Sequence, residues 1–134
     1  MALNLSVLIL AKNEEQNIED CIRSVSFAGE VVVIDDFSTD RTAELARGLG
    51  ARVVQRALAG DWGAQQTFAV QEAGCDWIYF LDADERVSPR LAERIKEIVA
   101  ADDRCYTYAN ARLSYYFEQP LRHGGWFSDY VVRL

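Results

Sequence analysis

Two aspartates at the end of an apolar run are the residues of this chain best suited to chemistry. Residues 77–81 (Trp-Ile-Tyr-Phe-Leu) are large and apolar or aromatic, and Asp82 and Asp84 follow directly. Such a run is typical of a strand covered on both faces, as in a parallel sheet. If the backbone stays extended, side chains two positions apart point to the same side. We therefore expect Asp82 and Asp84 to hold one hard cation, Mg²⁺ or Mn²⁺, together with water and phosphate. The alternative is a solvated acidic turn.

Two other apolar runs end in polar residues of the same kind. Residues 5–10 lead to Asn13 and Glu14, and residues 30–34 lead to Asp35 and Asp36. Open α/β sheets place their ligands at the carboxyl ends of the strands. Carboxylates gathered there repel one another unless a cation lies between them. Asp35 or Asp36 would accept hydrogen bonds from a base edge or a ribose hydroxyl; the alternative is an acid pair that favours the dipole of a following helix.

The apolar periodicity predicts the elements that position these residues. Strands are expected at 5–10, 30–34, 51–55 and 77–81, and helices at 14–26, from 38–40 to 49, at 63–73 and after Ser88-Pro89. Asn13 and Gln16 have the spacing of a capping box. Strict alternation of strands and helices predicts a parallel sheet with right-handed crossovers and helices on both faces. A further strand is expected within 104–113.

Length, charge and cysteine usage bound the classes of protein to consider. A chain of 134 residues is one domain by size, and its formal net charge of −7 argues against nucleic acid and an anionic membrane surface as partners. Its three cysteines, Cys21, Cys75 and Cys105, form no C-x-x-C pair. We interpret them as reduced cysteines of a cytoplasmic protein. Residues 131–134 (Val-Val-Arg-Leu) are strand-like and apolar except for Arg133, so we expect the chain to be cut from a longer protein.

A phosphate-binding glycine loop is missing from the sequence. Neither G-x-G-x-x-G nor a Walker A pattern occurs. If a nucleotide binds, its diphosphate must therefore be neutralised by metal and basic side chains.

Three ordered motifs resemble a known family. Residues 6–15 (Ser-Val-Leu-Ile-Leu-Ala-Lys-Asn-Glu-Glu), 33–40 (Val-Ile-Asp-Asp-Phe-Ser-Thr-Asp) and 80–85 (Phe-Leu-Asp-Ala-Asp-Glu) are similar to the signatures of family 2 glycosyltransferases. Residues 62–65 and 123–134 resemble the subgroup that transfers glucose or a similar sugar onto the lipopolysaccharide or lipooligosaccharide core. The resemblance implies a GT-A fold, an α/β Rossmann-like architecture with a mostly parallel sheet flanked by helices. It also implies a nucleotide-sugar-binding domain at 1–113 and the start of an acceptor-side segment at 114–134.

The resemblance also implies a mechanism and its residues. The UDP part of a UDP-sugar donor would be held by Ala11, Asn13, Glu14, Asp35 and Asp36. Asp82 would contact the ribose or the metal, and Asp84 would ligate Mn²⁺ or Mg²⁺. An inverting transfer needs a carboxylate to take the proton of the acceptor hydroxyl, and Asp129 is the candidate; the alternative is a surface aspartate without a role. The acceptor would be a cell-envelope glycan or a lipid-linked molecule. The enzyme would be cytoplasmic or at the inner face of the cytoplasmic membrane, with any peripheral membrane contact made beyond residue 134.

The chain departs from the family pattern at two places. Phe37 stands where the family usually has glycine, and Gln66-Thr67 replaces a Lys-Asn pair, which removes a cation that could meet the diphosphate. Arg56 or Arg86 could substitute for it.

Three alternatives stay open at this point. A response-regulator receiver domain would explain Asp35-Asp36 and the length, but the acidic pair follows the second strand rather than the first. A sugar nucleotidyltransferase would need a glycine-rich basic loop after the first strand, where this chain has Ala-Lys-Asn-Glu. The chain could also be a donor-binding half that transfers nothing by itself.

Overall fold

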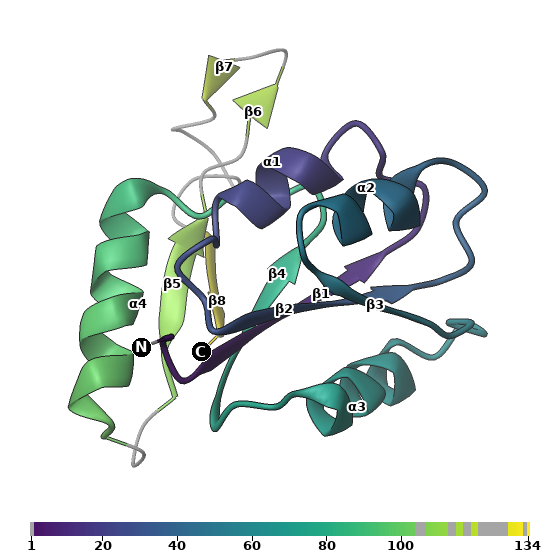
Figure 1. Cartoon of the computed structure of the whole chain (residues 1–134). Helices are drawn as coiled ribbons and strands as arrows, with labels where there is room; N and C mark the ends of the chain where they lie inside the picture. The colour runs from purple at the N-terminus through teal and green to yellow at the C-terminus, as the bar shows by residue number, and fades with distance from the viewer. Residues whose placement is uncertain (1, 104–106, 113–114, 117–118, 121–128, 133) are drawn as a thin grey trace. The chain divides into compact units, whose positions relative to one another are not determined.

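Four parallel strands organise the first of two compact units of the chain (Figure 1). The computed structural model describes residues 2–103, 107–112, 115–116, 119–120, 129–132 and 134, with side chains described to residue 109 and at 134. The units comprise residues 1–103 and 104–134. The predicted functional division after residue 113 remains a prediction.

The first strand in the sequence, β1, lies inside the sheet and is its most buried strand. The strands are β1 (Leu5–Ala11), β2 (Glu30–Asp35), β3 (Arg52–Gln55) and β4 (Trp77–Asp82), in the order β3-β2-β1-β4 with every pairing parallel. Ala11 lies opposite Asp35 in β2, and Leu10 lies opposite Asp82 in β4. The predicted parallel sheet is confirmed, and the three loops with acidic residues leave the same edge.

Helices cover both faces of this sheet. They are α1 (Ile18–Arg23), α2 (Thr42–Gly48), α3 (Trp62–Glu72) and α4 (Pro89–Ala101). Figure 1 shows α1 and α2 on one face and α3 on the other. Leu8, Val32 and Ile34 are fully buried with Ala69 of α3. The alternate residues Val7 and Ile9 point to the opposite face, where α1 buries Ile18, Cys21 and Ile22.

The helix starts differ from the sequence prediction where loops are tied to each other. The Asn13–Gln16 capping box is wrong: α1 begins at Ile18, and its N-cap Asn17 makes no side-chain capping bond. Instead the Asn13 side-chain oxygen accepts a hydrogen bond from the Thr39 N–H at 2.8 Å. The second helix likewise begins only at Thr42. Its Thr42 N–H donates to the Asp40 side chain at 2.9 Å. At the first helix, the long-range bond between Asn13 and Thr39 takes the place of the predicted capping box.

The start of α4 follows the sequence signal. The Ser88 hydroxyl accepts from the Leu91 N–H at 3.2 Å, and Pro89 opens the helix. Asp102 ends it in the left-handed conformation, with φ 52°. No helix in the described ranges is long and apolar enough to cross a bilayer.

The second unit contains two antiparallel strand pairs. β5 (Ala109–Arg112) pairs with β8 (Asp129–Val132), and β6 (Tyr115–Tyr116) pairs with β7 (Gln119–Pro120). β5 lies inside the range predicted as a strand. Residues 123–128 of the motif near the end of the chain lie outside the described residues.

One carboxylate connects three strands at the amino edge of the sheet. Glu30 Oε1 accepts a hydrogen bond from the Ser6 hydroxyl at 2.5 Å and another from the Gly74 N–H, and Glu30 Oε2 lies 3.9 Å from the Arg52 guanidinium. Burial alone would raise the pKa of Glu30, but the two hydrogen bonds and the charge of Arg52 outweigh it and lower the pKa below its usual value of 4.5. The charged form therefore stabilises the fold.

The substitution Glu30→Gln tests this network. A carboxyl whose pKa is lowered by folding contributes stability above its unfolded pKa, and the contribution is lost as pH falls through the folded pKa. We expect the variant to lose about 1 kcal/mol of unfolding free energy at pH 7. The difference from the natural chain should shrink below pH 4.5 in urea titrations across pH. Glu93→Gln, which removes an exposed pair with Lys96, is the control and should change little. A pH-independent difference would contradict this role.

Candidate functional site

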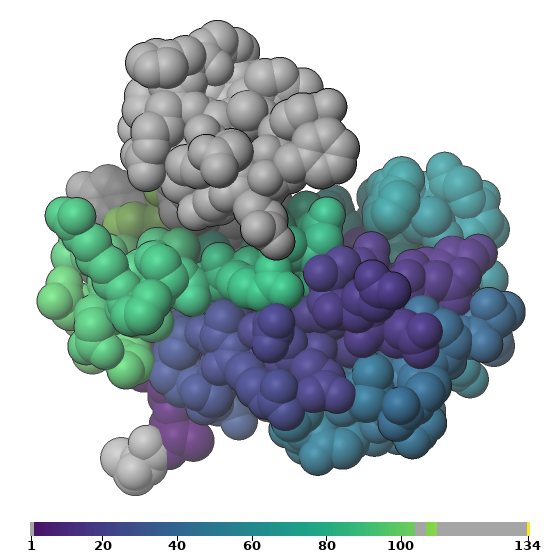
Figure 2. All heavy atoms as spheres, turned by 90° about the horizontal axis from the view of Figure 1, so that it is seen from above, coloured from purple at the N-terminus to yellow at the C-terminus, as the bar shows by residue number. Residues whose placement is uncertain are grey.

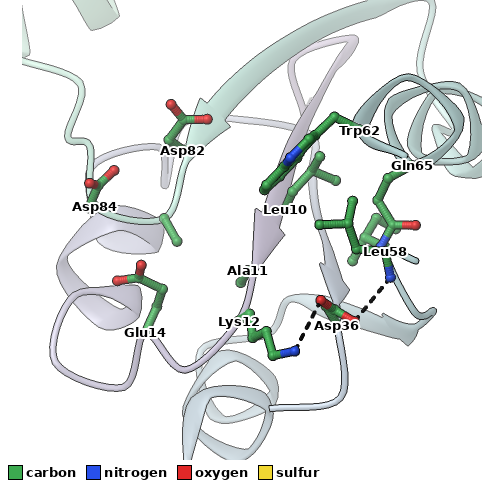
Figure 3. A pocket seen from close by; sticks show the side chains of 12 residues that line it. Leu10, Ala11, Lys12, Glu14, Asp36, Leu58, Trp62, Gln65, Asp82 and Asp84 are labelled. Carbon is green, nitrogen blue, oxygen red and sulfur yellow. Dashed lines mark hydrogen bonds and ion pairs between the residues drawn. The ribbon is translucent and has the colours of Figure 1, made fainter. Parts of the chain in front are cut away.

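A cavity of about 530 Å³ opens at the carboxyl edge of the sheet (Figure 3). Its walls come from the ends of β1, β2 and β4, the segment after β3 and the start of α3. The lining residues are Leu10, Ala11, Lys12, Glu14, Ile34, Asp36, Leu58, Trp62, Gln65, Asp82, Ala83 and Asp84. The chain winds outward from β1 to β2 and β3 and then returns to β4 on the other side of β1. This reversal is the point at which open α/β sheets bind ligands.

The space-filling view shows the same edge from above (Figure 2). The residues that follow β1, in purple, lie at the surface between those of α2, in blue, and those at the start of α3, in teal. Residues distant in the sequence therefore meet at this edge.

Five of the residues implied by the family resemblance line this cavity, namely Ala11, Glu14, Asp36, Asp82 and Asp84. Two others, Asn13 and Asp35, do not line it. Asp129 belongs to β8, but its side chain lies outside the described part of the chain.

The chain turns directly after Asp82, the last residue of β4, so Asp84 lies on a turn rather than on an extended strand. The strand ends at Asp82, and the Glu85 N–H donates to the Asp82 carbonyl at 2.9 Å. The Asp82 N–H in turn donates to Glu85 Oε1 at 2.9 Å. The assumption of extended backbone through residue 84 is therefore wrong. Ala83 is buried beneath the turn, whereas Asp82 and Asp84 are exposed and both line the cavity.

These two carboxylates suit a cation whose remaining coordination positions are filled by water and by the phosphate of a bound substrate. Within the described ranges, no group of three or more His, Cys, Asp or Glu residues is placed to hold a metal ion. Mg²⁺ and comparable hard ions are commonly bound through one or two carboxylates, with water and substrate phosphate as the remaining ligands. Asp82 and Asp84 fit such a two-carboxylate site. Glu14 lies nearby in Figure 3, and its carboxylate also accepts from the Asn17 side chain at 3.0 Å.

The two aspartates at the end of β2, Asp35 and Asp36, have different roles. Asp35 is fully buried and accepts hydrogen bonds from the Ser38 N–H at 3.1 Å, the Ser38 hydroxyl at 2.5 Å and the Gln55 amide at 3.3 Å. Asp36 lines the cavity and accepts from the Leu58 N–H at 3.0 Å. Asp35 therefore shapes the loop, in the manner of an Asx turn, while Asp36 is available to a ligand.

Asn13 joins the first loop to the second. Its N–H donates to the Ser38 hydroxyl at 2.8 Å, and its backbone has φ 52°, a conformation that asparagine tolerates well. The next N–H, of Glu14, donates to the Thr42 hydroxyl at 2.8 Å. The two loops therefore form one hydrogen-bonded floor beside the cavity.

Phe37 occupies a backbone position that suits glycine. Its φ of 47° lies in the left-handed region, which costs a residue with a side chain roughly 1–2 kcal/mol. The ring is 54% exposed and does not line the cavity. The replacement of glycine by Phe37 therefore strains the backbone of the loop and leaves the lining of the cavity unchanged.

The cation that lines the cavity is neither of the two arginines named as substitutes in the sequence analysis. Lys12 lines the cavity, and its Nζ lies 3.4 Å from Asp36 Oδ2. Arg56 instead donates to the Gln65 side chain at 2.6 Å and stacks on Phe68, and Arg86 pairs with Asp20 at 3.2 Å. Neither arginine lines the cavity. The available signal was the position of Lys12 at the carboxyl end of the first strand.

Cys21 lies beneath the turn that follows Asp82, and its thiol is unreactive. Its Sγ is 3.5 Å from the Asp82 carbonyl oxygen. Burial, followed by the charge of Glu85, raises the pKa of the Cys21 thiol to about 12, so it stays protonated at neutral pH. Cys21 and Cys75 are both free thiols; Cys105 lies outside the described residues.

The fold and cavity define an α/β domain with a ligand crevice at the switch point of its sheet. Comparison with known sequences then gives the family. The pattern described as Glycosyl transferase family 2 matches residues 6–128, and the chain belongs to this family. The receiver-domain and nucleotidyltransferase alternatives are therefore set aside.

Two relatives and one solved structure illustrate the similarity. The chain is 42% identical over 101 residues to an uncharacterized glycosyltransferase of Rickettsia bellii (strain RML369-C), covering 75% of this chain and 34% of the relative. It is 34% identical over 118 residues to the lipopolysaccharide core biosynthesis glycosyltransferase LpsC of Rhizobium meliloti (strain 1021), covering 84% and 43%. The structure of S. aureus TarS 1-349 matches with a TM-score of 0.65 and 26% identity, over 78% of this chain and 34% of that one. The predicted GT-A fold class is thus confirmed, and the chain spans less than half of these relatives.

Substitutions of Asp35 and Asp36 should distinguish the structural role of the first from the ligand-binding role of the second. We expect Asp35→Asn to lower the unfolding free energy by about 2 kcal/mol, because a buried carboxylate that accepts three hydrogen bonds is replaced by a group that cannot accept them all. Asp36→Asn, at a partly exposed carboxylate, is the matched control and should cost less than about 1 kcal/mol. Urea denaturation measures both, and equal losses would contradict the division.

Proposed function

We propose that this chain is the donor-binding half of a metal-dependent, inverting glycosyltransferase that moves a sugar, glucose by preference, from a UDP-sugar to a cell-envelope glycan or lipid-linked acceptor. The observation that carries the proposal is the meeting of Asp36, Asp82 and Asp84 in one cavity at the switch point of the sheet. Family membership supports the reaction class. The name of LpsC supports a cell-envelope acceptor, and the structure of TarS in complex with UDP, with a TM-score of 0.61 and 28% identity, supports the nucleotide.

The two sides of the cavity would bind different parts of the donor. Asp36 would accept a hydrogen bond from the nucleoside, and Asp82 and Asp84 would hold Mn²⁺ or Mg²⁺ against the diphosphate. The bound ion would act as a Lewis acid that stabilises charge on the leaving diphosphate. Ala11 closes the floor of the cavity, because its carbonyl accepts from the Asp36 N–H at 2.9 Å and fixes the loop against β1. Asn13 and Asp35 would act indirectly, by holding the two loops in place.

The acceptor side is assigned to the second unit and to sequence beyond this chain. Asp129 is the proposed base that takes the proton from the acceptor hydroxyl. The reaction would take place in the cytoplasm or at the inner face of the cytoplasmic membrane, with membrane contact through sequence beyond residue 134. Nucleic acid is not a proposed partner, because the net charge is −7.

Calorimetry with UDP tests the metal part of the proposal. We expect UDP to bind at least about tenfold more tightly in the presence of Mn²⁺, because the ion offsets repulsion between the diphosphate and the carboxylates. Asp84→Asn should abolish this difference and, because one repulsive charge is removed, should not weaken UDP binding in the absence of metal. Asp20→Asn, at an exposed carboxylate of α1 that does not line the cavity, is the control. No UDP binding by the natural chain with Mn²⁺ would refute the proposal.

The two lysines of the sequence offer a matched pair of variants. Lys12 lines the cavity, whereas Lys96 pairs with Glu93 on α4. We expect Lys12→Met to weaken UDP binding about tenfold while uridine binding changes less than about twofold, since a charge-assisted hydrogen bond to phosphate would be lost. Lys96→Met should affect neither ligand. Equal effects of the two substitutions on UDP affinity would argue against a role for Lys12.

A further inference from the structure

Trp62 is a large apolar side chain that the fold leaves uncovered inside the cavity. It is the first residue of α3 and is 62% exposed. The other exposed large hydrophobic side chains in the described part of the chain, Phe37 and Val70, do not line the cavity. Exposed apolar surface inside a concave site is typical of a ligand contact.

The start of α3 is held firmly enough to serve as a platform. The Asp61 carboxylate accepts from the Ala64 N–H at 2.9 Å and caps the helix. One turn on, Gln65 is 1% exposed and is fixed by two hydrogen bonds with Arg56, at 2.6 and 2.7 Å. The backbone that carries Trp62 is therefore preorganised, although the indole itself lies open.

The cavity has an apolar side and an acidic side. Trp62, Leu10 and Leu58 line the side nearer Asp36, and Figure 3 places Asp82 and Asp84 on the other. Leu58 lies directly beside Asp36, because its N–H donates to that carboxylate. A flat apolar face next to a hydrogen-bond acceptor matches the chemistry of a nucleobase, which has a π face and an N–H edge.

We propose that the Trp62 indole stacks on the nucleobase of the donor and orients its N–H edge toward Asp36. The inference rests on the proposed function, since it assigns a positioning residue within that site. With the base on the apolar side, the diphosphate is directed to the acidic side, where Asp82 and Asp84 lie. Base–aromatic stacking of this kind corresponds to roughly a 5- to 150-fold change in affinity.

Titration of the natural chain and of Trp62→Ala with uridine, UDP and UDP-glucose, each with Mn²⁺, tests the proposal. We expect all three dissociation constants to rise by the same factor, about tenfold or more, and Trp62→Phe to restore most of the affinity. Val70→Ala, at an exposed position on the same helix that does not line the cavity, is the control. Thermal melting of each variant checks that it is folded.

Intrinsic fluorescence gives a second and independent readout. Trp77 is 7% exposed and lies at the opposite end of β4 from the cavity. The third tryptophan, Trp126, is removed in a Trp126→Phe variant, in which uridine should quench the emission of Trp62, and adding Trp62→Phe should abolish this quenching.

The outcomes separate the inference from the function on which it rests. If the natural chain binds neither UDP nor uridine, both fail. If UDP binds but Trp62→Ala keeps the affinity for uridine, the proposed function stands and the stacking role is overturned. A loss for UDP-glucose alone would overturn it too, because Trp62 would then contact the sugar.

Discussion

The burial of β1 between two parallel neighbours is the constraint from which the rest of this domain follows. Leu5, Val7, Leu8 and Ile9 are fully buried, so the strand must be paired on both sides and covered on both faces. Pairing on both sides forces the chain to reverse its winding between β3 and β4. Because the loops after β1, β2 and β4 all leave the carboxyl edge, this reversal brings together residues as far apart in the sequence as Leu10 and Asp84.

Hydrogen bonds between loops then convert this edge into a defined surface. Asn13, Ser38 and Asp35 form a continuous chain of bonds between the loops after β1 and β2. Two residues in these loops, Asn13 and Phe37, have positive φ. The backbone strain at these two residues and the loss of the predicted helix cap are offset by hydrogen bonds between the loops. These bonds form only when β1 and β2 are paired. The shape of the floor is thus a property of the folded sheet rather than of either loop alone.

The sequence predicted the fold well because its signals are local and repeated. Apolar runs and intervening helical periodicity located every strand of the sheet to within one or two residues, and Ser88-Pro89 marked the start of α4. Prediction failed where a distant partner decides the conformation. The Asn13–Gln16 spacing is a valid capping signal, yet Asn13 bonds to Thr39 instead. The distinction between Asp35 and Asp36 depends on Gln55 and Leu58, which only the folded chain places beside them.

Motif residues describe only half of the cavity for the same physical reason. Motifs are recognised by charged residues at fixed spacing, and these found Asp36, Asp82 and Asp84. Leu58 belongs to no recognised motif, and residues 62–65 were recognised without a role being assigned to Trp62. Both side chains reach the cavity because α3 crosses the face of β1 and β2. An elongated donor with one planar end and one anionic end would have to lie across the end of β1 to use both sides. Its orientation would then be fixed by the asymmetry of the sheet, with the apolar side set by β2 and α3 and the acidic side set by β4.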